Sequence, residues 1–238
     1  SLKVLKDELD IIRRQFNSYD WHRYFITGGI EQLNVLNNAV EYVLKTKESE
    51  TKFMQHCKKM KSAYAICCNS DNISQQEDDD IHFFFAIRSI IFKLTKGDAA
   101  DTTKMNRHVA EMIKDALISE TVEEIANIGV AEECKIDLLS SDYMKRLAQL
   151  PEKNTKVKLM EQLLKKVIDS IRKVNRQKGV DFTQRLEDIV KRYNDRSDDA
   201  ALANDVIEDV VQQMMDLMED VKDSRTAGDA IGLFFEVM

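Results

Sequence analysis

The chain of 238 residues has one proline and seven glycines, and only 7% of its residues are aromatic. An all-β domain needs a tight turn roughly every ten residues, and so few turn-forming residues cannot supply them. Leu, Ile, Met, Ala, Glu, Lys and Gln are abundant instead, and these residues favour helices. The composition therefore predicts an all-α fold, whose length allows one large domain or two small ones.

Motifs that carry chemistry are also missing. The sequence has no G-x-x-x-x-G-K-[ST] phosphate loop, no G-x-G-x-x-G, no G-x-S-x-G and no H-E-x-x-H. The four histidines stand in separate segments, and the four cysteines lack the C-x-x-C spacing of a zinc site. We therefore expect no catalytic residue, no cofactor-binding residue and no metal ligand in this chain.

Membrane segments are absent from the sequence pattern. The chain opens without an apolar signal run, and no stretch of about 18 apolar residues follows. The adjacent Cys67 and Cys68 are expected to be free thiols rather than a bridge, which suits a reducing compartment. The sequence thus predicts a soluble protein of the cytoplasm that does not contact a membrane.

What the chain has in quantity is helical periodicity. Apolar residues recur at three-and-four spacing in the first segment, namely Leu2, Leu5, Leu9, Ile12 and Phe16. Similar stripes begin near residues 33, 53, 81, 105, 157, 182 and 202. The pattern predicts a bundle or array of roughly eight to ten helices.

An acidic run, residues 77–80, precedes the apolar run of residues 81–94. A calcium loop would need carboxylates at alternate positions and a central glycine, and this run has neither. Four negative charges at a helix N-terminus are favoured by the helix macrodipole, so we expect a helix to begin there.

Breaks in the periodicity predict three parts. Residues 1–20 form a first helix, residues 21–150 a helical subdomain with Gly28-Gly29 near its start, and residues 151–238 a second subdomain that begins at Pro151, the single proline. Within the last part, Gly179-Val180-Asp181 predicts a helix end followed by a cap at Asp181, and residues 197–199 predict a further cap.

Charge is unevenly distributed along the last part. Residues 152–196 carry a net charge of +6 and residues 197–229 a net charge of −8, in a chain whose net charge is −7. Two interpretations stay open: the acidic helix pairs with the basic hairpin, or a basic face is left for phosphates or a partner. The candidate contact residues are Lys156, Lys165, Lys166, Arg172, Lys173, Arg176, Lys178 and Arg185.

Several segments resemble a known family. Residues 154–168 and 173–182, followed by Arg185-Leu186-Glu187 and Arg192-Tyr193-Asn194, resemble the helical C-terminal region of the R (restriction, or motor) subunit of type I restriction–modification enzymes. Residues 28–44, 83–91 and 136–143 are similar to that family in the same order. The resemblance covers nearly the whole chain after about residue 19.

The resemblance implies a part of a larger protein. In that family the R subunit carries a nuclease domain and two helicase-like motor domains, which hydrolyse ATP, translocate duplex DNA and cut it. The parent protein would then be an ATP-dependent type I site-specific deoxyribonuclease, with ATP and Mg²⁺ bound outside this chain. Residues 1–20 would lead out of the second motor domain.

The helical region itself is implied to be a scaffold. It would dock the motor and nuclease onto the methyltransferase core, with methyltransferase and specificity subunits as partners and duplex DNA bound through the complex. The alternative is a module that contacts DNA non-specifically through the basic hairpin 156–185. Residues 21–25 are either an anchor for docking or a hydrophobic plug between helices.

Overall fold

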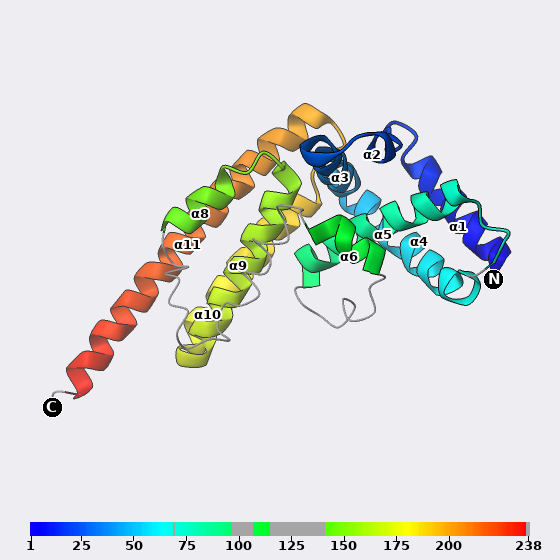
Figure 1. The fold of residues 1–238 in the computed structure, drawn as a ribbon. Coiled ribbons are helices and arrows are strands. Elements are labelled where there is room, and N and C mark those ends of the chain that lie inside the picture. Colours follow the sequence, from blue (N-terminus) through cyan, green and yellow to red (C-terminus); the bar gives the residue numbers. More distant parts are fainter. Residues whose placement is uncertain (69, 97–106, 115–140, 237–238) are drawn as a thin grey trace. The chain divides into compact units, whose positions relative to one another are not determined.

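A computed structural model describes residues 1–68, 70–96, 107–114 and 141–236. In these ranges it contains ten helices and no strand, which confirms the predicted all-α array (Figure 1). The chain forms two compact units, residues 1–126 and residues 127–238, and each is described by itself. The three-part division at residues 20 and 150 stays a prediction.

The first unit contains six of the described helices. They are α1 (Leu2–Gln15), α2 (Arg23–Ile26), α3 (Gly29–Leu44), α4 (Lys47–Cys67), α5 (Gln75–Lys96) and α6 (Arg107–Lys114). Helices α1 and α4 pack against each other in antiparallel directions. At one end of the pair, the Gln15 side chain at the end of α1 donates to the carbonyl of Ser49 near the start of α4 (2.9 Å). Helix α5 packs on α3, α4 and α6.

An aromatic cluster fills the core of the first unit. The Phe16 ring lies 5.2 Å from the ring of Phe84 and 5.9 Å from that of Phe53, between ring centroids. Trp21 packs edge-on against Phe16 at 6.1 Å. These rings come from α1, α4, α5 and the turn before α2, so burying them joins segments distant in sequence.

The acidic run lies in the first turns of α5, as the macrodipole predicts. Ser74 and Glu77 form a capping box: the Glu77 carboxylate accepts from the Ser74 backbone N–H (2.8 Å), and the Ser74 hydroxyl accepts from the Glu77 N–H (3.2 Å). The hydrogen bond from the Ser74 N–H lowers the pKa of Glu77, and Lys6 adds to the effect.

The second unit contains α8 (Ser141–Ala148), α9 (Lys153–Val174), α10 (Arg176–Asn194) and α11 (Ala200–Glu236). Helices α9, α10 and α11 pack on one another, and α8 contacts α9 and α11 (Figure 1). Their core is mostly aliphatic, with Leu163, Leu164, Val210, Met214 and Leu217 fully buried, and it also contains the buried Tyr193 ring. The amphipathic stripes predicted for this part thus face one another.

The turn between α9 and α10 differs from the sequence prediction. Helix α9 ends at Val174, and Asn175 caps α10 by accepting from the N–H of Lys178 (3.1 Å), so the break lies at Asn175 and not at residues 179–181. The predicted cap Asp181 lies inside α10, where it accepts from Gln177 (3.0 Å). The further cap is confirmed, because Asp199 accepts from two amides of the first turn of α11.

Gly179 has a packing role in place of the predicted break. A Cβ at this position would lie 2.6 Å from the Cβ and 2.7 Å from the Cα of Arg172 on α9. Only a residue without a side chain allows the two helices to approach so closely next to their turn. Gly179 is therefore required at this position by a helix–helix contact and not by a helix end.

The described helices and cysteines also bear on the predictions about membrane segments and disulfide bonds. Among the described helices, none combines the length and the apolarity needed to cross a membrane. Cys57, Cys67 and Cys68 are free, which confirms the expectation for the adjacent pair. Cys134 lies outside the described residues.

Candidate interaction surfaces

The candidate cations of the second unit divide into two groups by their surroundings. On the body of the hairpin, Lys156 donates to the carbonyl of Ala148 (2.8 Å), at the end of α8. Lys165 forms an ion pair with Glu161 one turn away on α9 (2.5 Å). Both side chains are therefore held by neighbouring residues within the unit.

Two ion pairs join α10 to the acidic helix α11. Arg185 lies 2.7 Å from Asp220, and Arg192 lies 2.6 Å from Asp209, between guanidinium nitrogen and carboxylate oxygen. All four side chains are about half exposed. This is the internal pairing that one interpretation of the charge pattern expected, and at the surface it stabilises the unit only slightly.

Arg172 and Lys166 complete the group on the body. The Arg172 guanidinium donates to the Thr183 hydroxyl on α10 (2.6 Å) and lies 3.7 Å from Asp169. Lys166 is half-buried. Arg172 thus links the two helices of the hairpin next to the Gly179 contact.

The second group lies at the end of the hairpin. Lys173, Arg176 and Lys178 are exposed, and their side chains form no hydrogen bond or ion pair with any residue in the described part of the chain. Val174 between them is 90% exposed. We call residues 173–178 the hairpin tip.

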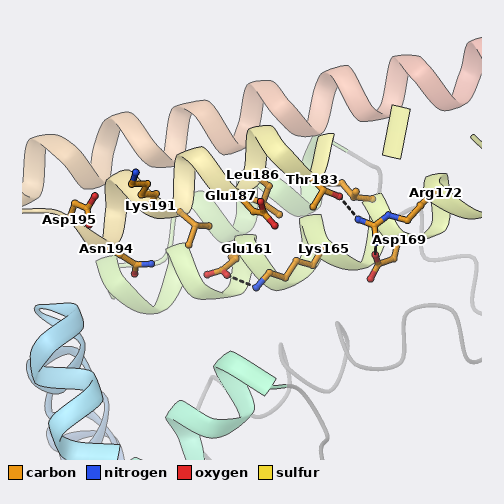
Figure 2. Close-up of a pocket in the computed structure, with 12 residues that line it drawn as sticks. Glu161, Lys165, Asp169, Arg172, Thr183, Leu186, Glu187, Lys191, Asn194 and Asp195 are labelled. Carbon is orange, nitrogen blue, oxygen red and sulfur yellow. Dashed lines mark hydrogen bonds and ion pairs between the residues drawn. The ribbon is translucent and has the colours of Figure 1, made fainter. Parts of the chain in front are cut away.

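A groove of about 400 Å³ runs between α9 and α10 (Figure 2). Its floor is apolar, from Ile168, Leu186 and Val190, and its rim carries charges of both signs. Figure 2 shows that Lys165 and Arg172 are already bound within it, to Glu161 and to Thr183 and Asp169. The sequence did not predict this groove.

The first unit exposes an apolar corner where α2 meets α3. Ile26 is 82% exposed and Ile30 79% exposed, and the chain between them turns through Gly29, whose φ of +56° favours glycine. Phe25 is 37% exposed. We call Phe25, Ile26 and Ile30 the apolar corner.

The residues behind this corner are firmly held. Trp21 and Tyr24 are buried, as the plug interpretation expects for that part of residues 21–25. The Trp21 indole donates to Asp80 (2.9 Å), and the Tyr24 ring lies 5.1 Å from that of Phe83. An exposed ion pair between Arg23 and Glu31 (2.6 Å) borders the corner. The sequence did not predict the exposure of Ile26 and Ile30, because a helical stripe does not distinguish exposed from buried apolar residues.

Several titratable groups of the first unit contact one another. Glu8 lies 2.6 Å from His56, and the Tyr64 hydroxyl donates to Asp78 (2.7 Å) beside His82. Burial and the bond to Asp78 raise the pKa of Tyr64. Within the described residues, no group of three or more His, Cys, Asp or Glu side chains is placed to hold a metal ion.

The sequence model of one family matches residues 1–236, and that family is described as the C-terminal region of type I restriction enzyme HindI endonuclease subunit-like proteins. The chain belongs to this family. The predicted resemblance is thereby confirmed for nearly the whole chain.

A curated relative agrees with this family. The type I restriction enzyme HindI endonuclease subunit of Haemophilus influenzae is 22% identical over 210 residues, which cover 86% of this chain. The matched region is 19% of that relative's length, so the chain corresponds to about one fifth of it. No solved structure shows a significant match.

Proposed function

We propose that this chain is the scaffold region of a type I restriction endonuclease subunit, and that it docks the motor and nuclease onto the methyltransferase core. Family membership and the one-fifth share of the relative's length support a regional role. The observation that carries the proposal is the apolar corner, which exposes two isoleucines on a rigid aromatic support.

The corner has the composition of a docking site. Interfaces combine a buried apolar centre with a polar rim, and the Arg23–Glu31 pair supplies such a rim beside Ile26 and Ile30. Because Tyr24 and Trp21 fix the backbone behind it, little conformational freedom is lost on binding. Burying the two isoleucines would contribute about 3 kcal/mol or more.

The remaining roles follow from the family as proposals. The whole subunit would cut DNA in an ATP-dependent reaction in the cytoplasm, with ATP and Mg²⁺ bound outside residues 1–238. The methyltransferase and specificity subunits would be its partners in one complex. This chain's own contribution is the position of the motor relative to that complex.

The test is a titration of the full-length subunit with its methyltransferase core. We expect the double substitution Ile26→Glu and Ile30→Glu to weaken binding about 100-fold, because two charges would be buried without partners. The matched control is Val4→Glu with Leu202→Glu, which places the same charges at two other exposed apolar positions (48% and 58%). The control is expected to bind like the unsubstituted subunit.

Two outcomes would contradict the proposal. Equal affinity of the corner variant and the unsubstituted subunit would exclude the apolar corner as the docking face. Failure of the unsubstituted subunit to bind the methyltransferase core would exclude the scaffold role altogether. Since all four substituted side chains are exposed, thermal unfolding should be similar in both variants and checks that both are folded.

A further inference from the structure

We propose that the hairpin tip contacts the phosphate backbone of duplex DNA through Lys173, Arg176 and Lys178. This goes beyond docking, because it gives the second unit a DNA contact of its own. It also reduces the eight sequence candidates to three residues, chosen by their surroundings in the fold.

The cations of the second unit differ in whether the fold already binds them. Lys156, Lys165 and Arg185 are bound to a carbonyl or carboxylate of the same unit, and Arg172 is bound to Thr183. The three cations of the tip have no such contact among the described residues. Cations that the fold does not use, gathered within six residues, are available for an anionic partner.

The hairpin tip is held rigidly at its base. The close contact between Gly179 and Arg172 holds the ends of α9 and α10 together, and the Arg172–Thr183 bond adds a link beside it. Lys173 in the last turn of α9 and Lys178 in the first turn of α10 therefore project from one narrow end. The helix dipoles oppose each other there, so the positive potential comes from the side chains.

The residues of the tip favour one kind of anionic partner. Single-stranded nucleic acid needs aromatic side chains for stacking, and the nearest aromatic residue, Phe182, is buried. Base recognition in the major groove uses Arg, Asn or Gln contacts to base edges. Here the Oδ1 of Asn175 caps α10 and the Gln177 amide donates to Asp181, which leaves Arg176 as the one exposed side chain of the tip suited to a base edge.

A single arginine cannot specify a DNA sequence, whereas all three cations of the tip can contact backbone phosphates. Lysine and arginine neutralise backbone phosphates without reading sequence, and this needs no further groups at the tip. The chain as a whole carries a net charge of −7, so binding elsewhere on its surface is disfavoured. The predicted contact is therefore local, non-specific and dependent on salt.

The test uses the 238-residue chain and a short DNA duplex of arbitrary sequence, with fluorescence anisotropy recorded between 50 and 200 mM salt. Three phosphate contacts give a slope of log K against log salt of about −2.7, which is about a 40-fold loss of affinity over that range. The triple variant Lys173→Gln, Arg176→Gln, Lys178→Gln should lose most of the binding and nearly all of the slope.

The matched control is Lys165→Gln, Arg185→Gln, Arg192→Gln, which removes the same charge from partnered positions of the same hairpin. We expect this control to keep the slope and most of the affinity. The conservative variant Lys173→Arg, Lys178→Arg should bind like the unsubstituted chain, because phosphate contact needs the charge alone.

Three outcomes would overturn the proposal. One is absence of binding at 50 mM salt, and another is equal loss in both triple variants, which would show an effect of net charge only. The third is loss of methyltransferase binding by the tip variant with DNA binding intact, which would assign the tip to an acidic protein surface. The docking proposal is tested with other residues and another ligand, so the two can fail separately.

Discussion

The two units of this chain use aromatic and charged residues in different ways. The first unit is built around a cluster of rings that includes Phe16, Phe53 and Phe84, and it buries an ion pair between Arg13 and Asp80 (2.7 Å). The second unit has a mostly aliphatic core with one fully buried ring, that of Tyr193, and its ion pairs between α10 and α11 lie about half exposed.

The two units therefore differ in how strongly the fold depends on their charged side chains. Asp80 is almost fully buried and accepts hydrogen bonds from both Arg13 and Trp21. Its carboxylate is therefore held in place by residues 67 and 59 positions away in the sequence. The exposed pairs of the second unit are screened by water and salt. We therefore expect a charge change at Asp80 to alter stability more than a charge change in the exposed pairs of the second unit.

The largest effect should come from Asp80→Asn. The substitution keeps the shape but leaves the partly buried Arg13 guanidinium with only the exposed Asp10 carboxylate, 3.5 Å away, as a counter-charge, which costs about 3 kcal/mol of the free energy of unfolding. Urea unfolding of the 238-residue chain measures it. The matched change in the second unit, Asp220→Asn, should cost less than about 1 kcal/mol, and similar losses at both sites would remove the contrast between the units.

A smaller effect is expected from Gly179→Ala. The added methyl group would lie 2.6 Å from the Arg172 Cβ, so α9 and α10 must separate, at a cost of about 2 kcal/mol. Gly28→Ala in the first unit is the control, because an added Cβ there meets no atom within 4 Å. Thermal unfolding of the two variants measures the loss of stability. A Gly179→Ala variant as stable as the unsubstituted chain would show that α9 and α10 tolerate a wider separation near the tip.

The smallest effect concerns the Arg185–Asp220 pair. A double-mutant cycle with Arg185→Gln and Asp220→Asn should give a coupling energy of about 0.5 kcal/mol at low salt, falling toward zero at about 1 M salt. Unfolding in urea at the two salt concentrations provides the measurement. A coupling that persists in high salt would mean that these pairs stabilise the second unit as the buried pair does the first.

Much of the fold was predictable because helical periodicity is local. The stripe from Leu5 to Phe16 faces the core of the first unit, and Asp199 caps α11 as its position before an apolar stripe indicates. The acidic run also begins a helix as predicted. Each of these features depends on residues within three or four positions, and the sequence displays them directly.

The candidate surfaces were only partly predictable. The sequence provided eight candidate cations in the basic hairpin, but it did not show that Arg185 is paired and Lys178 is not. The partner of Arg185, Asp220, lies 35 residues away and on another helix. It placed the helix break at Gly179, since a glycine at a close contact has the same local appearance as a glycine at a helix end. Ile26 and Ile30 likewise carried no sign of exposure.

The scarcity of proline and glycine, together with the spacing of apolar residues, determined that this chain is helical and which face of each helix is buried. Similarity along the sequence determined its family. Only the tertiary structure decided which charges are used within the fold and which apolar residues stay exposed. The physical reason is range: a helical turn spans four residues, whereas ion pairs and helix contacts join groups that only folding brings within a few ångströms.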